Sequence, residues 1–143
     1  NSVMALINTS AIVGFGFVVQ NVPAFKSFIN FALSMQFNPL VSAAIAVNVI
    51  AGITGSASGG LTIFMKALGA EYIKSGANPE ALHRVCSIAS GGLDSLPHSG
   101  AVITLLMVMG LTHKEAYKDL GVVTVVIPLV VTALAVVIGI TMY

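Results

Sequence analysis

Four long uncharged runs constrain the fold of this chain more than any other feature of its sequence. They cover residues 1–25, 27–65, 95–113 and 120–143, and ten of the eleven charged residues lie between Lys66 and Asp119. A helix crosses the hydrocarbon core of a bilayer with about 20 apolar residues. Each run is about that long or longer. The runs therefore predict an all-α, multi-pass integral membrane protein.

The composition agrees with this expectation and excludes several classes of protein. Only 8% of the residues are charged and 57% are hydrophobic, whereas soluble domains carry about 25% charged residues. The formal net charge of +1 provides no basic field for nucleic acid. The single cysteine, Cys86, forms no internal disulfide, and the sequence contains neither a Cys/His cluster nor a P-loop. We expect no metal, no nucleotide and no organic cofactor.

The first residues indicate a piece of a longer polypeptide. The chain opens at Asn1 without an initiator methionine and enters apolar sequence at once, with no basic region typical of a signal peptide. We expect it to be the end of a longer polypeptide of the size of a transporter. Its expected partners are then the missing N-terminal half of the same polypeptide, the lipid bilayer and, in a homo-oligomer, further copies.

Residues 1–37 are predicted to form a broken or re-entrant hairpin. Asn8-Thr9-Ser10 and Gly14-Phe15-Gly16 interrupt its first arm, and residues 20–23 join the arms. The hairpin ends before Pro39, because one helix over the uncharged run 27–65 would be about 58 Å long. Two tilted spans are the alternative.

Two regular segments follow in the prediction. Residues 38–66 should form a transmembrane helix that is unwound at residues 52–60, where four of nine residues are glycines, each costing a helix about 1 kcal/mol relative to alanine. Residues 67–84 should form an amphipathic surface segment with a loop at 75–77. Asn78 is its candidate N-cap and Pro79 occupies the first helical position.

The C-terminal part is predicted to contain a second broken helix. Residues 85–110 should cross the membrane with a break at 91–100. Residues 111–121 should form a surface helix that begins with a Thr112/Glu115 capping box and ends at Gly121. Residues 122–143 should form the final transmembrane helix.

The three predicted breaks are the candidate functional site. Unwound backbone at membrane depth is tolerated only where protein buries it or where it lines a cavity, and secondary transporters bind substrates and ions at such places. Packing through the Gly55/Gly59 GxxxG pattern is the alternative for the middle break. Hydroxyl, amide and glycine groups at the breaks suit a hydroxylated carboxylate, and the candidate substrate-binding residues are Asn8, Thr9, Ser10, Thr54, Gly55, Ser56, Ser58, Gly59, Ser95 and Ser99.

Asp94 and His98 are the candidate proton-coupling residues. Asp94 is the one acidic residue inside a break, and an ionisable group inside a membrane protein is a functional hypothesis by default. His98 follows four residues later, and a carboxylate and an imidazole together could relay a coupling proton. The alternative is that Asp94 only caps the helix that follows the break. His83 and His113 lie in charged segments and are expected at the solvated surface.

Three segments carry a resemblance to a known family. They are residues 55–60 (GSASGG), residues 90–104 (SGGLDSLPHSGAVIT) and residues 111–115 (LTHKE). With these motifs the chain resembles the C-terminal part of the gluconate permease family, within the ion transporter superfamily. The resemblance implies an inner-membrane, proton-driven symporter for organic acid anions, built from inverted repeats with hairpins and broken helices. This chain would lie in the second repeat.

The motifs depart from those of the sugar-acid members of that family. Those members carry Gly-Ser-Ala-Thr at the first motif and Ser-His-Val-Asn-Asp-Ser-Gly at the second. This chain has Gly55-Ser56-Ala57-Ser58 at the first and the run 94–100 (DSLPHSG) at the second. It resembles more closely the branch associated with short hydroxy acids such as 3-hydroxybutyrate.

Together these observations predict a secondary transporter rather than an enzyme. The substrate is expected to be a small carboxylate, gluconate or a short hydroxy acid, and the coupling ion H⁺ or Na⁺. Two alternatives come from other classes. One is an intramembrane serine hydrolase with Ser58 as nucleophile and His98 as base. The other is a non-catalytic membrane assembly subunit that packs through Gly55 and Gly59.

Overall fold

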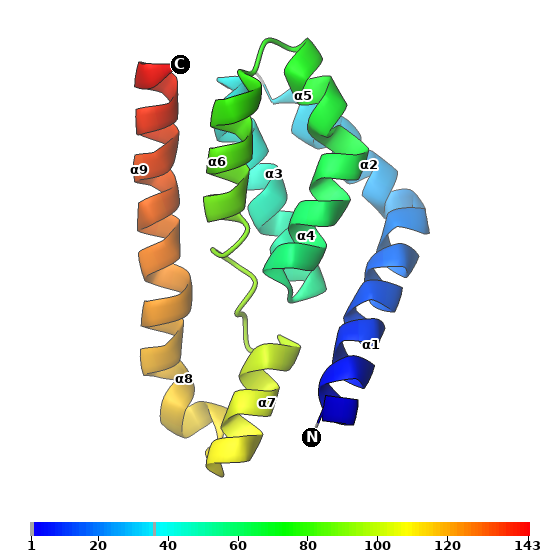
Figure 1. Cartoon of the computed structure of the whole chain (residues 1–143), viewed down its shortest axis with the longest axis vertical. Coiled ribbons are helices and arrows are strands. Elements are labelled where there is room, and N and C mark those ends of the chain that lie inside the picture. The colour runs from blue at the N-terminus through cyan, green and yellow to red at the C-terminus, as the bar shows by residue number, and fades with distance from the viewer. Residues whose placement is uncertain (1, 36) are drawn as a thin grey trace.

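The computed structural model describes residues 2–35 and 37–143, without the side chains at 2, 4, 5, 8, 9, 12, 13, 15, 16, 20 and 26. Every regular element in this part of the chain is a helix, so the all-α prediction is confirmed (Figure 1). The elements are α1 (Ser2–Asn21), α2 (Pro23–Ser34), α3 (Pro39–Thr54), α4 (Ala57–Phe64), η1 (Met65–Gly69), α5 (Ala70–Lys74), α6 (Pro79–Ala89), α7 (Gly100–Met109), α8 (His113–Gly121), η2 (Val122–Val126) and α9 (Ile127–Met142).

The first predicted break is wrong. Helix α1 runs without interruption through Asn8-Thr9-Ser10 and through Gly14 and Gly16. These residues lower helix propensity by less than about 1 kcal/mol each, and only proline forces an interruption. The chain bends where Pro23 begins α2, and in Figure 1 α2 continues the course of α1 away from the N-terminus. Helices α1 and α2 therefore form a bent rod instead of the hairpin expected for residues 1–37.

The predicted transmembrane helix at 38–66 is also wrong, because the chain reverses in its middle. Helix α3 ends at Thr54, Gly55 adopts a left-handed conformation (φ 60°), and Ser56 begins α4. Helix α4 then returns along α3 (Figure 1). Gly60 makes the return possible: a Cβ atom on it would lie 2.5 Å from Ala51 Cα. The glycines thus build a tight helical hairpin rather than an unwound span.

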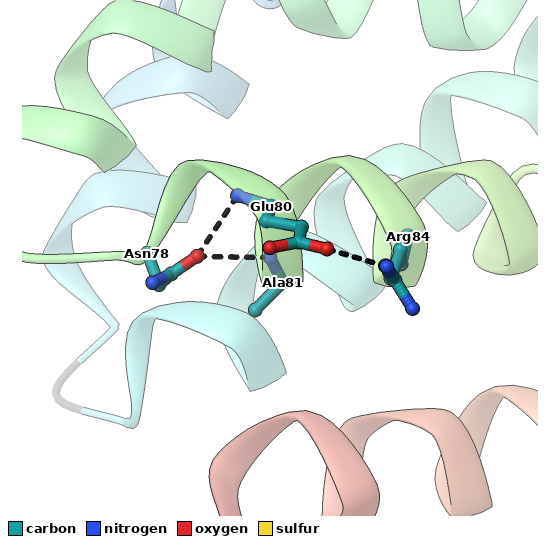
Figure 2. Close-up of polar contacts among 4 residues, drawn as sticks. All are labelled: Asn78, Glu80, Ala81 and Arg84. Atoms are coloured by element: carbon teal, nitrogen blue, oxygen red, sulfur yellow. Dashed lines mark hydrogen bonds and ion pairs between the residues drawn. The ribbon is translucent and has the colours of Figure 1, made fainter. Parts of the chain in front are cut away.

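Helix α4 continues through the π-helical turn η1 into α5, and the loop that follows is as predicted. Helix α5 ends at Lys74, and Gly76 takes a positive φ of 97° in the loop. Asn78 Oδ1 accepts hydrogen bonds from the N–H groups of Glu80 (2.9 Å) and Ala81 (3.2 Å) (Figure 2). Pro79 occupies the first helical position. One turn later, Arg84 donates to Glu80. The predicted cap of α6 is therefore confirmed.

The second half of the chain contains the break that the sequence indicates. Helix α6 ends at Ala89, residues 90–99 form no regular element, and α7 begins at Gly100. Thr112 starts the next helix, and its N–H and hydroxyl both donate to Glu115 Oε2, at 2.8 and 2.6 Å. The predicted surface helix does not end at Gly121, because α8, η2 and α9 form one continuous helix over His113–Met142. Gly121 keeps right-handed helical geometry and the π-helical turn η2 absorbs the junction.

The helix His113–Met142 is the one in the described residues that is long and apolar enough to cross a membrane. Its first turns carry the charges Lys114, Glu115, Lys118 and Asp119, and the uncharged part begins at residue 120. At 1.5 Å per residue, that part spans about 34 Å, which matches the hydrocarbon core. A chain with several spans stays a prediction.

Helix α3 forms the centre of the packing. It contacts α4, α6 and α9, and its alanine-rich faces allow these neighbours to approach closely. Val47 and Ile50 of α3 are buried with Phe64, Leu82 and Val85 of the surrounding helices. Other large apolar side chains on α7 and α9 are exposed, including Val108 at 80%. Such exposed apolar faces are those of a protein surrounded by lipid or by further helices.

Candidate functional site

The turn between α3 and α4 is held by its own polar side chains. The Thr54 hydroxyl donates to Ile50 O (2.9 Å) and Ala51 O (3.2 Å), within its own helix. Ser56 Oγ accepts from Gly59 N–H (3.1 Å) as the N-cap of α4. Ser58, one residue inside α4, is exposed, and no hydrogen bond of its hydroxyl occurs among the described residues. Two of the predicted binding hydroxyls therefore stabilise the turn and one faces outward.

The segment 90–99 lies against this turn, so the structure brings two of the predicted breaks together. His98 Nε2 lies 2.8 Å from Gly52 O, and the Ser99 hydroxyl donates to Gly55 O at 3.1 Å. Because a carbonyl oxygen only accepts, His98 carries a proton on Nε2. The backbones also approach closely, since a Cβ atom on Gly55 would lie 3.2 Å from Ser99 Cα. Gly55 of the GxxxG pattern is thus required by its positive φ and by this close contact.

The other side of the segment 90–99 is bound by α8. Tyr117 Oη donates to Ser95 O (3.0 Å), and His113 Nε2 lies 2.9 Å from Pro97 O. His113 is exposed, as the sequence predicts, but its ring also contacts the segment; Tyr117 was not singled out from the sequence. The two residues are four positions apart, so they lie on one face of the helix that begins just after α7, and this spacing is the sequence signal for their contact. Side chains of the segment thus bind carbonyl groups at the end of α3, and side chains of α8 bind carbonyl groups of the segment.

Asp94 neither binds His98 nor caps α7, the two arrangements that the sequence suggests. Its Oδ1 accepts a hydrogen bond from the Ser95 hydroxyl (2.9 Å), and no hydrogen bond joins it to His98. It does not cap α7, because the N-cap of that helix is Ser99. The capping alternative for Asp94 is therefore wrong. The carboxylate lies half-buried in the middle of the segment 90–99.

Several backbone N–H groups of this region have no partner in the described chain. The N-cap Ser99 makes no side-chain hydrogen bond to the first turn of α7, because its hydroxyl is bonded to Gly55 O. Within the segment 90–99, the N–H groups of residues 90, 91, 92 and 99 have backbone partners in the described chain, whereas those of 93–96 and 98 have none there. A helix N-terminus with such neighbours attracts anions.

The predicted residues of α1 do not join this region in the same way. The side chains of Asn8 and Thr9 lie outside the described residues, and Ser10 is exposed on α1. Helix α1 contacts α3 and α4, but no hydrogen bond of Ser10 to the α3–α4 turn occurs in the described structure. The part of the chain that the structure describes also holds no cluster of three or more His, Cys, Asp or Glu residues placed to bind a metal ion.

Comparison with known proteins gives one informative relative. Over 130 aligned residues, which are 87% of this chain, the sequence is 44% identical to the uncharacterized transporter YxjC of Bacillus subtilis (strain 168). The chain spans only 27% of the length of that relative. No family model and no solved structure matches. The likeness supports a transporter in general, in agreement with the prediction from the sequence, and does not extend to a substrate or to the gluconate permease family.

Proposed function

We propose that this chain forms part of the substrate pathway of a secondary active transporter for small organic acid anions. The whole protein is a multi-pass inner-membrane symporter of the gluconate permease family, carrying gluconate or a short hydroxy acid such as 3-hydroxybutyrate together with a proton. The transporter relative supports the general function. The resemblance of residues 55–60 and 90–104 to the family motifs supports the class of substrate.

One observation carries the proposal: the α3–α4 turn and the segment 90–99 meet through His98 and Ser99. Broken helices that meet in this way are typical of substrate sites in secondary transporters. The uncapped first turn of α7 and the unpaired N–H groups beside it provide donors and a positive dipole end for a carboxylate. Ser58, with its free hydroxyl, is the candidate ligand for the substrate's hydroxyl group.

The coupling proton is assigned to Asp94. This carboxylate lies in the same segment as the unpaired amides, so its ionisation changes the charge that a bound anion experiences. His98 then acts mainly as the residue that fixes the segment, through its bond to Gly52 O. The hydrolase alternative is not favoured, because no hydrogen bond joins Ser58 to His98 and His98 Nε2 donates elsewhere.

Uptake by cells that express the full-length polypeptide tests this function. We expect radiolabelled 3-hydroxybutyrate or gluconate to accumulate, and a protonophore to abolish the accumulation. Asp94→Asn should remove accumulation against a gradient at neutral pH, and full accumulation by this variant would refute the coupling assignment. The absence of uptake of both acids by a well-expressed protein would refute the proposed substrate class.

Two substitutions test the site itself. Gly100→Pro deletes the first amide of α7 with little effect on folding, because proline is favoured at this position and Ser99 has the extended ψ of 133° that a following proline requires. Loss of one hydrogen bond to a charged group costs about 1.5–3 kcal/mol, so KM should rise by about 10- to 100-fold. Ser58→Ala should also impair uptake, whereas Ser87→Ala, an equally exposed serine on α6, should not.

A further inference from the structure

A groove between α3 and α9 adjoins the segment 90–99 through Leu93, which is one of its lining residues. It has a volume of about 440 Å³. The groove follows about two turns of each helix, roughly 10 Å. Its exposed rim includes Ile45, and the small residues Ala44 and Ala133 lie along it. Its lining is apolar except for two residues, Asn48 of α3 and Thr132 of α9.

These two residues hold buried oxygen atoms that lack partners. Asn48 and Thr132 are each only 6% exposed. Asn48 Nδ2 donates to Ala44 O (3.1 Å), but Asn48 Oδ1 and Thr132 Oγ1 have no hydrogen-bond partner in the described structure. Buried polar atoms in native proteins are nearly always hydrogen-bonded. That both unpaired atoms belong to residues lining one groove indicates that something absent from this structure completes it.

The chemistry of the groove selects its occupant. A lipid acyl chain would fill the apolar walls but leave both oxygens unpaired. Water would pair with the oxygens but is disfavoured by walls that are otherwise apolar. A membrane helix satisfies both requirements, because small residues allow helices to approach closely and Ser, Thr, Asn and Gln side chains form hydrogen bonds between helices. The soft terminal torsion of Asn48 allows its amide to turn toward such a helix.

The length of the relative supplies a source for this helix. The chain corresponds to 27% of the transporter from Bacillus subtilis, so the remaining 73% lies outside the match. We infer that the α3–α9 groove is the docking site for a transmembrane helix from the rest of the same transporter polypeptide. That helix carries a small residue at the crossing point and a hydroxyl or carboxamide side chain that pairs with Asn48 and Thr132. This inference rests on the proposed function only in assuming a larger transporter.

Site-specific photo-crosslinking in the full-length polypeptide tests the docking site. A benzophenone amino acid at Ile45, which is 41% exposed at the rim, should crosslink to one apolar peptide outside residues 1–143 of the same molecule. The same probe at Val108, which is 80% exposed on α7, is the control and should give several-fold less of that product. The adduct is identified by mass spectrometry, with isotopically mixed protein to separate contacts within one copy from contacts between copies.

The other outcomes overturn the inference. Crosslinking to residues 1–143 of a second copy would make the groove a subunit interface, and adducts with lipid alone would make it a lipid-facing surface. If the crosslink is found, the polar residue of the crosslinked helix can be replaced by alanine. Combined with Asn48→Ala, this substitution should give non-additive losses of stability. Uptake measured on the same protein keeps the two proposals apart, because the helix contact can be present when neither acid is transported, and absent when transport is normal.

Discussion

The substitution Gly60→Ala tests the α3–α4 hairpin, on which the position of the proposed site depends. The added Cβ would lie 2.5 Å from Ala51 Cα, 2.7 Å from Ala51 N and 2.9 Å from Ala51 Cβ. The first two are backbone atoms of a buried helix, so no side-chain rotation removes the clash. The two helices must instead move apart at their closest contact.

The magnitude follows from two opposing terms. Overpacking a well-packed interior costs typically about 1–3 kcal/mol, and contact with rigid backbone puts this site at about 3 kcal/mol. Alanine is favoured over glycine inside a helix by about 1 kcal/mol. The net destabilisation is therefore about 2 kcal/mol, or about a 30-fold decrease in the ratio of folded to unfolded protein.

The assay is unfolding of the purified protein in detergent by increasing amounts of sodium dodecyl sulfate, followed by far-UV circular dichroism. Gly14→Ala is the matched control, because a Cβ on Gly14 would meet no atom within 4 Å and only the gain in helix propensity remains. We expect Gly60→Ala to be less stable and Gly14→Ala to be equally or more stable than the parent. Equal stabilisation by both substitutions would refute the close packing of α3 against α4.

Three further predictions use the same assay. Gly92→Ala should destabilise the fold by about 1–3 kcal/mol, because its Cβ would collide with Asn48 Oδ1. Adding Asn48→Ala should restore part of this loss, and strictly additive effects of the two substitutions would contradict the contact. Tyr117→Phe should cost about 1 kcal/mol by removing the donor to Ser95 O, and an unchanged stability would show that this bond contributes nothing. Asn78→Ala should cost about 1 kcal/mol through loss of the α6 cap, whereas a neutral result would argue against that cap.

The features that could be predicted from the sequence are local ones. The Asn78-Pro79 helix start and the Thr112/Glu115 pairing depend on residues within one turn of each other, and both are present. The break at 91–100 was recognisable for a similar reason, because three glycines and Pro97 lie within ten residues. Propensity and capping are properties of short segments, so a sequence reports them directly.

The errors concern features that depend on contacts between distant segments. A cluster of glycines is compatible both with an unwound helix and with a reversal of the chain, and the close approach of Gly60 to Ala51 decides for the reversal. Gly121 was expected to end a helix, but a glycine ends a helix only where it takes a positive φ, as Gly110 does at the end of α7 (φ 67°). Nothing in the neighbouring residues of Gly121 indicates which conformation it adopts.

The sequence shows where polar side chains gather at the breaks, but not which groups they bind. The hydrogen-bond partners of Ser99 and His98 lie 44 and 46 positions away and leave no trace in the local sequence. The contacts of His113 and Tyr117 were missed because a charged, amphipathic segment looks the same whether its polar face meets water or a backbone carbonyl group.

This distribution of hydrogen bonds changes which groups can contact a substrate. The hydroxyls of Thr54, Ser56 and Ser99 are already bonded within the protein, so they hold the two breaks in place rather than bind a ligand. The bonds of Thr54 and Ser99 satisfy carbonyl groups, and that of Ser56 satisfies an amide group. The amides of residues 93–96 and 98 have no partner in the described structure, and the Ser99 side chain does not cap the first turn of α7. Unpaired backbone donors attract an anion rather than a cation. In the proposed transporter, selectivity for a carboxylate would therefore arise from backbone amides.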